Sequence, residues 1–158
     1  MENGSLGQTL NTFGILNESL PASYVVKILE GLHYLHQGSI IHGDLRAVNI
    51  LTTKNGNVKL SDFSVTLNLR QMEGDMKDVL YIPYWMAPEV IELKGVSTKA
   101  DIWSLGCTVI TGRPPYADIT NTMGGMYIML HWNQASVNLL LQLCTALLKM
   151  TCRLYQNV

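Results

Sequence analysis

The sequence predicts one mainly α-helical domain that carries a small β-hairpin. Three observations support this fold class: helical spacing of apolar residues over 19–38, a second helical segment within 97–110 that is followed by Gly112 and Pro114-Pro115, and two short alternating segments on either side of residues 54–57. A chain of 158 residues with 47% hydrophobic and 15% charged residues suits one domain or a large part of one.

The first predicted helix lies between residues 19 and 38. Its apolar positions recur three and four residues apart and form one stripe, made of Val25, Ile28, Leu29, Leu32 and Leu35. Ser19 suits the N-cap, Pro21 suits the first turn, and Gly38 suits the position that ends the helix. The apolar stripe must pack against another part of the chain.

The hairpin is predicted where the spacing changes from helical to alternating. Residues 50–53 and 58–61 alternate in polarity, and the Asn55-Gly56 pair between them is a strong hairpin signal. A two-residue loop at Asn55 and Gly56 would fix which residues of the two strands face each other.

Oxygen-bearing side chains gather at the open end of this hairpin. With a two-residue loop, Asn49 faces Asp62, and Asp44 precedes Asn49 by five residues. Carboxylate and amide oxygens suit Mg²⁺, which is usually held by one or two protein groups together with substrate phosphates. The alternative is a surface hairpin whose ends carry Asn and Asp because these residues favour turns. The spacing alone leaves both interpretations open.

The second helix is predicted within residues 97–110, and Gly112 followed by Pro114-Pro115 marks its end. Residues 65–88, between the hairpin and this helix, are expected to form a long irregular connection. Beyond these prolines the pattern weakens until residues 135–152, which again favour a helix.

The composition excludes several classes of protein. A formal net charge of -1 argues against a nucleic-acid-binding domain and against an anionic membrane surface as partner. The apolar run at residues 137–150 is too short for a membrane span and includes Asn, Gln and Lys. The first residues carry no secretory signal, and three cysteines without a CxxC pair suit a reducing compartment. We therefore expect a cytoplasmic location, with a nuclear one as the alternative.

Four short motifs follow one another along the chain. They are HGDLRAVN at residues 42–49, DFS at 62–64, APE at 87–89 and DIWSLG at 101–106. Their order and spacing resemble the catalytic set of protein kinases, and the wording is most similar to the MAP-kinase-kinase-kinase-like (STE) group, with fungal septation-initiation kinases nearest. The resemblance implies that residues 1–130 form part of the C-terminal large lobe of a protein-kinase-like fold. A divergent helical tail would follow at residues 131–158, and the N-lobe is expected to be absent.

The resemblance implies roles for the polar residues of the hairpin region. Asp44 corresponds to the base that accepts the proton of the substrate hydroxyl, and Arg46 stands where a cationic residue supports the transferred phosphate. Asn49 and Asp62 correspond to the Mg²⁺ ligands. ATP and Mg²⁺ are therefore the implied substrate and cofactor, with a protein substrate or a partner kinase or scaffold as partner.

The same resemblance places three further residues. Leu51 would form the floor of the adenine site, and Ser5 would lie near the ribose. Asp101 would anchor the backbone of the catalytic loop from the second predicted helix. Around Ser5, the segment 4–7 is too short for a loop that cradles phosphates and suits the start of a helix better.

Several positions depart from the pattern of a working kinase. Gly43 replaces an Arg found in many relatives, and Ser64 replaces a Gly whose backbone freedom is normally used. Ile82 replaces a Thr and Tyr81 a Gly, and the helix predicted near residues 98–111 is shorter than in relatives, which should strain its packing.

The 158 residues contain no Gly-x-Gly-x-x-Gly loop and no Val-Ala-Ile-Lys segment, so half of the nucleotide clamp is missing from this chain. The resemblance therefore implies a serine/threonine kinase segment that transfers phosphate from ATP to protein hydroxyls by family but is inactive by itself and binds Mg-ATP weakly. The alternative is a pseudokinase-like binding module or a non-functional truncated product.

His33 and His36 lie three residues apart on the first predicted helix. This spacing could place two imidazoles on one face for a metal ion, but Glu30 is the only Cys, Asp or Glu residue near them in the sequence. Ordinary helix-surface residues are therefore the favoured interpretation.

Overall fold

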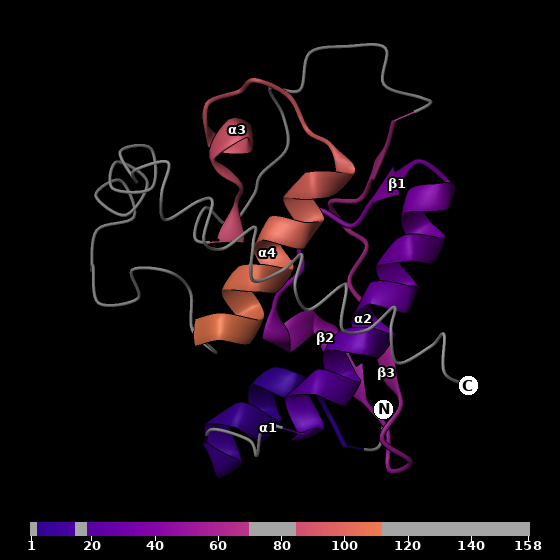
Figure 1. The fold of residues 1–158 in the computed structure, drawn as a ribbon, viewed down its shortest axis with the longest axis vertical. Helices are drawn as coiled ribbons and strands as arrows, with labels where there is room; N and C mark the ends of the chain where they lie inside the picture. The colour runs from indigo at the N-terminus through magenta and orange to yellow at the C-terminus, as the bar shows by residue number, and fades with distance from the viewer. Residues whose placement is uncertain (1–2, 15–18, 70–84, 112–158) are drawn as a thin grey trace.

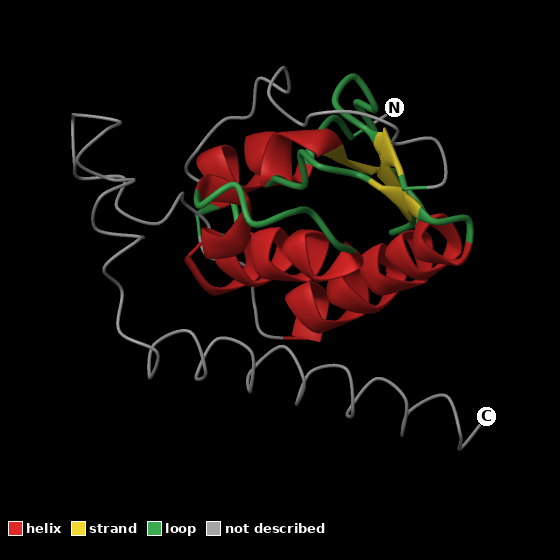
Figure 2. Cartoon of the chain, turned by 90° about the horizontal axis from the view of Figure 1, so that it is seen from above, coloured by secondary structure: helices red, strands yellow, loops and turns green. Residues whose placement is uncertain are grey.

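The structure is a computed structural model that describes residues 3–14, 19–69 and 85–111 (Figure 1). Helices make up most of the described body, and the short strands gather toward one side of it (Figure 2). The elements follow one another as α1 (Leu6–Phe13), α2 (Ser19–Gln37), β1 (Ile40–Ile41), the 3-10 turn η1 (Ala47–Asn49), β2 (Ile50–Thr52), β3 (Val58–Leu60), β4 (Leu67–Asn68), α3 (Pro88–Ile91) and α4 (Thr98–Thr111). The described residues include no helix long and apolar enough to cross a bilayer.

Helix α2 follows the predicted stripe. Val25, Ile28 and Leu32 are buried, and the helix packs against β1, β3 and α4. Its start and end differ slightly from the prediction. Ser19 belongs to the helix instead of capping it, and the left-handed residue that follows the helix is Ser39, with φ of 62°, instead of Gly38.

The hairpin forms, but its register is one residue away from the prediction. Strand β2 pairs with β3 so that Ile50 faces Leu60, and the loop holds three residues instead of two. The backbone N–H of Gly56 donates to the carbonyl of Thr53 at 3.0 Å, and Gly56 has φ of 68°. Asn55 is not left-handed, although a two-residue Asn-Gly turn would require that conformation. The turn is therefore a three-residue loop closed by a left-handed glycine.

Helix α1 begins with the cap expected around Ser5. The Ser5 hydroxyl accepts from the backbone N–H of Gln8 at 3.2 Å, and the Gln8 side chain accepts from the backbone N–H of Ser5 at 2.9 Å. Just before the helix, the chain runs beside β2, where the N–H of Thr52 donates to the carbonyl of Gly4 at 3.0 Å. Strand β2 therefore lies between β3 and residues 3–5.

A second strand pair, β1 with β4, was not predicted. Ile41 lies opposite Leu67, so the chain after the DFS motif returns to the start of the HGDLRAVN loop. Two-residue strands carry too few positions to show an alternating pattern, and residues 65–69 were expected to be irregular. This strand pair brings together the two ends of the segment 42–66, which contains the HGDLRAVN and DFS motifs.

Helix α4 forms where it was predicted and is buried along most of its described length. It contributes to both hydrophobic clusters of the core. One cluster contains Leu6, Ile28, Leu32, Leu45, Ile50 and Leu105, and the other contains Ala87, Val90, Ala100, Trp103 and Cys107. The predicted stop at Gly112 and the predicted tail at 131–158 lie outside the described residues.

The short helix α3 begins with Pro88, whose missing N–H costs nothing at the first helical position. It ends with the N–H of Lys94 donating to the carbonyl of Glu89 at 2.9 Å and with Leu93 in the left-handed region, at φ of 56°. This helix carries the Ala87-Pro88-Glu89 motif and packs its residue Val90 in the second cluster.

Candidate active site

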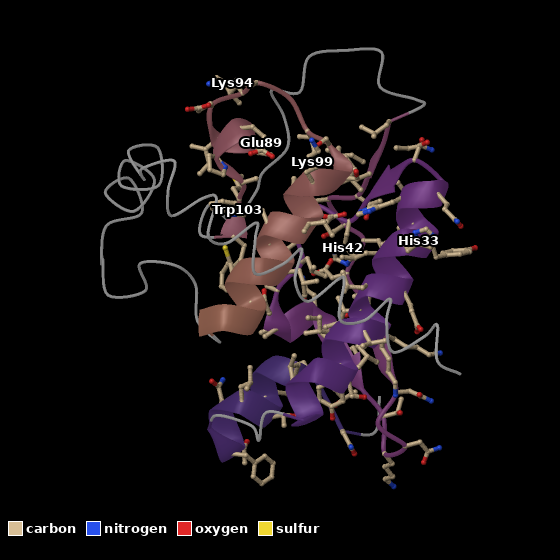
Figure 3. The ribbon with its side chains drawn as sticks, viewed as in Figure 1. His33, His42, Glu89, Lys94, Lys99 and Trp103 are labelled. Atoms are coloured by element: carbon tan, nitrogen blue, oxygen red, sulfur yellow. The ribbon has the colours of Figure 1, made fainter. Side chains whose placement is uncertain are left out.

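The side chain of His42 joins the HGDLRAVN loop to strand β3. It is completely buried, between α2 and α4, whereas His33 lies on the exposed side of α2 (Figure 3). Nδ1 of His42 accepts from the backbone N–H of Asp44 at 3.3 Å, and Nε2 lies 3.1 Å from the carbonyl of Ser61. Because a carbonyl only accepts, these contacts assign the proton to Nε2. The ring of Phe63 packs against the imidazole, with 5.0 Å between centroids.

Asp101, on α4, holds the same loop from the other side. Its carboxylate, which is 1% exposed, accepts from the backbone N–H groups of His42 and Gly43, each at 3.0 Å. The imidazole Nε2 of His36 on α2 lies 2.8 Å from Oδ2 of the same carboxylate. The predicted anchoring role of Asp101 is confirmed, and His36 contacts this carboxylate.

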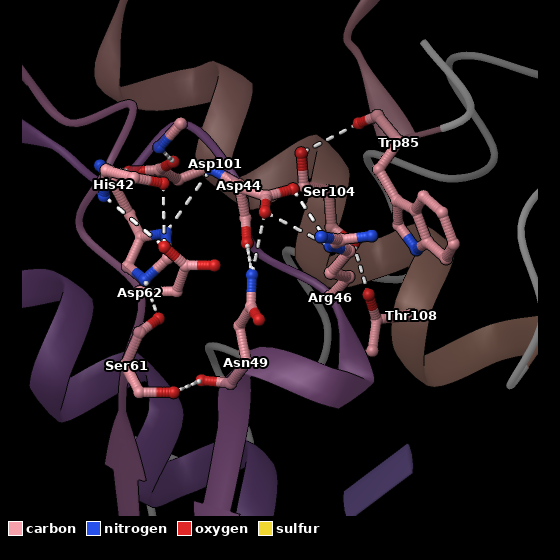
Figure 4. Close-up of polar contacts among 12 residues, drawn as sticks. His42, Asp44, Arg46, Asn49, Ser61, Asp62, Trp85, Asp101, Ser104 and Thr108 are labelled. Carbon is pink, nitrogen blue, oxygen red and sulfur yellow. Dashed lines mark hydrogen bonds and ion pairs between the residues drawn. The ribbon is translucent and has the colours of Figure 1, made fainter. Parts of the chain in front are cut away.

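Asp44 projects from the anchored loop and is surrounded by hydrogen-bond donors. Nε of Arg46 lies 3.1 Å from each carboxylate oxygen, and Nδ2 of Asn49 donates to Oδ2 at 2.8 Å (Figure 4). Nδ2 of Asn49 also donates to the backbone carbonyl of Asp44 at 2.9 Å. The arrangement fixes a carboxylate beside a guanidinium, and such a carboxylate can accept a proton from a hydroxyl while the cation attracts a phosphate.

The contacts of Asn49 also fix its carbonyl oxygen. Because Nδ2 is committed to Asp44, Oδ1 of Asn49 is the atom left to bind another group. Within the described part of the chain, no hydrogen bond reaches this oxygen. Across the hairpin, the backbone carbonyl of Asn49 accepts from both the N–H and the hydroxyl of Ser61, each at 3.0 Å.

Asp62 lies one residue beyond the position that faces Asn49, so the predicted direct pairing of these two residues is wrong. The three-residue loop shifts the register by one and places Ser61 opposite Asn49. Asp62 is exposed and left-handed, with φ of 64°. The pKa of its carboxyl is lowered because the hydroxyl and then the backbone N–H of Ser64 donate to it. Asp62 is nevertheless near the HGDLRAVN loop, because the charge of Arg46 also lowers the pKa of its carboxyl, and Figure 4 draws it with Asp44 and Asn49.

The donors of this group fit Mg²⁺ by their chemistry. Asn49 offers a carbonyl oxygen with no other partner among the described residues, and Asp62 offers an exposed carboxylate. A small number of hard oxygen donors is what Mg²⁺ uses when substrate phosphates complete its shell. Of the two residues, Asp62 is exposed and Asn49 is buried. A site built from three or more His, Cys, Asp or Glu side chains does not occur within the described ranges.

The two residues predicted to contact the nucleotide are neighbours in the fold. Ser5 and Leu51 form an antiparallel bridge, and Leu51 is half-buried in β2. The Ser5 hydroxyl already accepts from the N–H of Gln8 as the cap of α1, but it retains its own proton for another acceptor. Their roles at the adenine and the ribose stay predictions.

The two departures from the kinase pattern that lie in the site are accommodated by the backbone. Gly43 has φ of 81°, a conformation that costs glycine nothing, and its N–H is one of the two backbone N–H groups held by Asp101. Ser64 is not left-handed, so the expected penalty for its Cβ is wrong. The left-handed residue of the DFS motif is Asp62 instead. The departures at Tyr81 and Ile82 lie outside the described residues.

Sequence reasoning missed three contacts of the site. The guanidinium carbon of Arg46 lies 6.0 Å from the centre of the Trp85 ring, and the Trp85 carbonyl accepts from the hydroxyl of Ser104 on α4 at 2.7 Å. The pair of His36 with Asp101 spans 65 residues, so no local spacing could reveal it.

Comparison with known proteins identifies the family. A family model described as "Protein kinase domain" matches residues 1–152. A Dictyostelium discoideum protein named as a "probable serine/threonine-protein kinase" is 51% identical over 130 residues, which cover 80% of this chain and 20% of that protein. "MAP3K epsilon protein kinase 1" of Arabidopsis thaliana is 52% identical over 124 residues, which cover 75% of this chain and 9% of that protein. "Cell division control protein 7" of Schizosaccharomyces pombe is 50% identical over 124 residues, which cover 77% of this chain and 12% of that protein.

The chain thus spans a fifth or less of the length of these relatives. The matched segments include the HGDLRAVN loop and α4, which the structure joins through Asp101. With a family model matching nearly its whole length, the chain belongs to the protein kinase family, and its relatives include serine/threonine kinases.

Proposed function

We propose that this chain carries the base and the metal-binding half of a serine/threonine kinase site that transfers the γ-phosphate of ATP to a protein hydroxyl. The observation that carries the proposal is the Asp44 carboxylate, held by Arg46 and Asn49 on a loop that Asp101 anchors. Phosphoryl transfer depends mainly on positioning and on charge neutralisation, and this arrangement supplies both.

In this proposal each residue has a distinct task. Asp44 accepts the proton of the substrate hydroxyl. At the same time the oxygen of that hydroxyl bonds to the γ-phosphorus of ATP, and the bond from that phosphorus to the ADP leaving group breaks. Arg46 places a positive charge beside the base, where the phosphoryl group would arrive. Asn49 and Asp62 would hold Mg²⁺, which neutralises phosphate charge when bound.

The 158 residues do not include the rest of the nucleotide clamp. A glycine-rich loop and a strand lysine are the parts that other kinases use to hold the phosphates, and neither motif occurs in this sequence. We therefore expect the isolated chain to be inactive and the site to act only with a lobe that supplies these groups. Val48 and Phe63, each about half exposed beside the site, give such a lobe apolar surface to cover.

The alternative is a binding module without catalysis, and the same exposed apolar side chains favour it. Under this alternative a partner kinase or scaffold would cover Val48 and Phe63, and Asp44 would have no role in turnover. We also propose that the chain belongs to the MAP-kinase-kinase-kinase-like group near the fungal septation-initiation kinases, a placement supported by relatives named "MAP3K epsilon protein kinase 1" and "Cytokinesis protein sepH".

A chimaera tests the proposed function. The ATP-binding lobe of a related kinase is joined in front of residue 1, and transfer of labelled γ-phosphate to a protein substrate is measured. We expect transfer by the chimaera and a loss of about 100-fold or more in Asp44→Asn. Glu92→Gln, which removes an exposed carboxylate that directly follows α3 and pairs with Lys94, is the matched control and should retain activity.

The isolated chain gives the companion measurement, and its transfer should equal that of its own Asp44→Asn variant. A chimaera that folds and binds Mg-ATP but transfers nothing, or whose transfer is unchanged by the Asp44→Asn substitution, would contradict the proposal and favour the binding module.

A further inference from the structure

Ser64 makes the shortest hydrogen bond to the Asp62 carboxylate. Its hydroxyl donates to Oδ1 of Asp62 at 2.7 Å, whereas its backbone N–H reaches the same oxygen only at 3.4 Å. A glycine at position 64 could offer the longer bond alone. The side chain therefore adds the contact that a hydrogen-bond distance of 2.7 Å marks as strong.

Little else restrains this carboxylate. Asp62 is exposed, and within residues 3–14, 19–69 and 85–111 no other group donates a hydrogen bond to its side chain. An exposed carboxylate without such a contact populates several rotamers, and a metal ion must then select one of them. The bond from Ser64 selects one in advance.

The bond also gives the two carboxylate oxygens of Asp62 different partners. Oδ1 accepts from Ser64, so Oδ2 is left for a metal ion. Hydrogen bonds to ligating carboxylates orient them, and their loss typically weakens metal binding by about 10- to 100-fold. The backbone of Ser64 has no positive φ, so the side chain reaches this position without strain.

We propose that Ser64 is a positioning residue that orients the Asp62 carboxylate for Mg²⁺. This inference rests on the metal-binding role given to Asp62 in the proposed function. In the sequence analysis Ser64 is a departure from the pattern of a working kinase. In this proposal the same serine supports metal binding by Asp62. An ordinary turn offers the competing explanation, because Asp side chains often accept from the backbone two residues on. In an ordinary turn the hydroxyl would be dispensable for metal binding.

Manganese titration of the full 158-residue chain separates these explanations. Mn²⁺ alone replaces Mg²⁺, and its paramagnetic broadening of the amide signals near Asp62 and Asn49 gives the concentration for half-saturation. Ser64→Ala and Ser64→Gly should raise that concentration by about 10-fold or more. Ser64→Thr, which keeps a hydroxyl, should stay within about 3-fold of the wild type.

Two controls accompany the titration. Asp62→Asn should abolish saturable broadening. Ser97→Ala removes another serine hydroxyl, one that accepts from the backbone N–H of Lys99 at 3.3 Å near the start of α4, and should leave the titration unchanged. The amide spectrum of each variant reports whether it keeps the fold.

The outcomes are distinguishable. If Asp62→Asn matches the wild type, the metal site of the proposed function is wrong and the role of Ser64 falls with it. If Asp62→Asn abolishes binding but Ser64→Ala and Ser64→Gly match the wild type, the metal site stands and the positioning role is overturned. Weak binding by both Ser64 variants, with recovery in Ser64→Thr, supports the inference.

Discussion

The carboxylate of Asp101 is buried and accepts hydrogen bonds from two backbone amides, and it lies against an imidazole that is partly exposed. The amides of His42 and Gly43 would be costly to leave unpaired there, since a buried donor without an acceptor costs about 1–3 kcal/mol. One residue of α4 therefore holds the conformation of a loop that is 58 residues away in sequence. The loop geometry depends on this residue more than on any local turn.

Asp101→Asn should destabilise the chain by about 2–4 kcal/mol, because it replaces one acceptor oxygen with a donor and removes the buried charge. Urea denaturation gives the free energy of unfolding. Asp62→Asn is the matched control, and as an exposed substitution it should change that free energy by no more than about 0.5 kcal/mol. Equal effects of the two variants would show that Asp101 does not hold the loop.

At the scale of elements, the hairpin shows what local sequence can and cannot decide. The Asn-Gly pair correctly predicts a tight turn, but it fits both a two-residue and a three-residue loop. The choice is made by contacts outside the pair: the N–H of Asn57 donates to the hydroxyl of Thr53 at 3.0 Å, and the N–H of Thr53 donates to the carbonyl of Asn57 at 3.0 Å. Because one residue of register changes every facing pair, the predicted neighbour of Asn49 was wrong.

A pair of alanine substitutions tests this loop. Gly56→Ala should cost about 1 kcal/mol or more because Gly56 is left-handed, and Asn55→Ala should cost little because Asn55 is not. A two-residue turn would instead penalise both substitutions, since both residues would then be left-handed. The free energy of unfolding from thermal or urea melts of the two variants distinguishes the loops. Similar losses of stability in both variants would support the predicted two-residue loop, in which Asn49 faces Asp62.

Long periodic segments and ordered motifs were the predictable part of this molecule. Helices α2 and α4 follow from spacing because each has several turns over which a pattern can repeat. The fixed order of the motifs pointed to Asp44, Asn49 and Asp62 as candidates, and Asn49 hydrogen-bonds to Asp44, but the roles of the three residues stay predictions. Strands β1 and β4 were missed because two residues carry no period. The link between His36 and Asp101 was missed because side chains far apart in sequence meet only after folding.

For the whole molecule, α4 is the element that the two hydrophobic clusters share. Leu105 faces the cluster that includes α2, and Trp103 and Cys107 face the cluster beneath α3. Leu45 of the anchored loop belongs to the first cluster and Asp101 of α4 holds the loop backbone, so contacts within the described chain fix the shape of the loop. Shape and affinity are separate properties here, because the residues that would clamp the phosphates are not among these 158.

Mg-ATP should therefore stabilise the isolated chain only slightly. When the ligand concentration equals Kd, the gain is about 0.4 kcal/mol, which corresponds to a rise in Tm of roughly 1–2 °C for a chain of this size. We expect a thermal shift no larger than this at millimolar Mg-ATP. A rise of many degrees that Asp62→Asn removes would mean that the half-site alone binds nucleotide strongly.

The pairing of residues 3–5 with β2 has a practical consequence for anyone who attaches another protein or a tag to the start of this chain. Asn3 and Gly4 form hydrogen bonds with Thr52 of β2, the strand that directly follows Asn49. A pull on residues 3–5 would reach Thr52 through the Gly4 carbonyl, and Thr52 lies only three residues after Asn49 in the sequence. Fusion linkers at this end should therefore be long and slack, so that the added partner exerts no tension on the metal-binding edge.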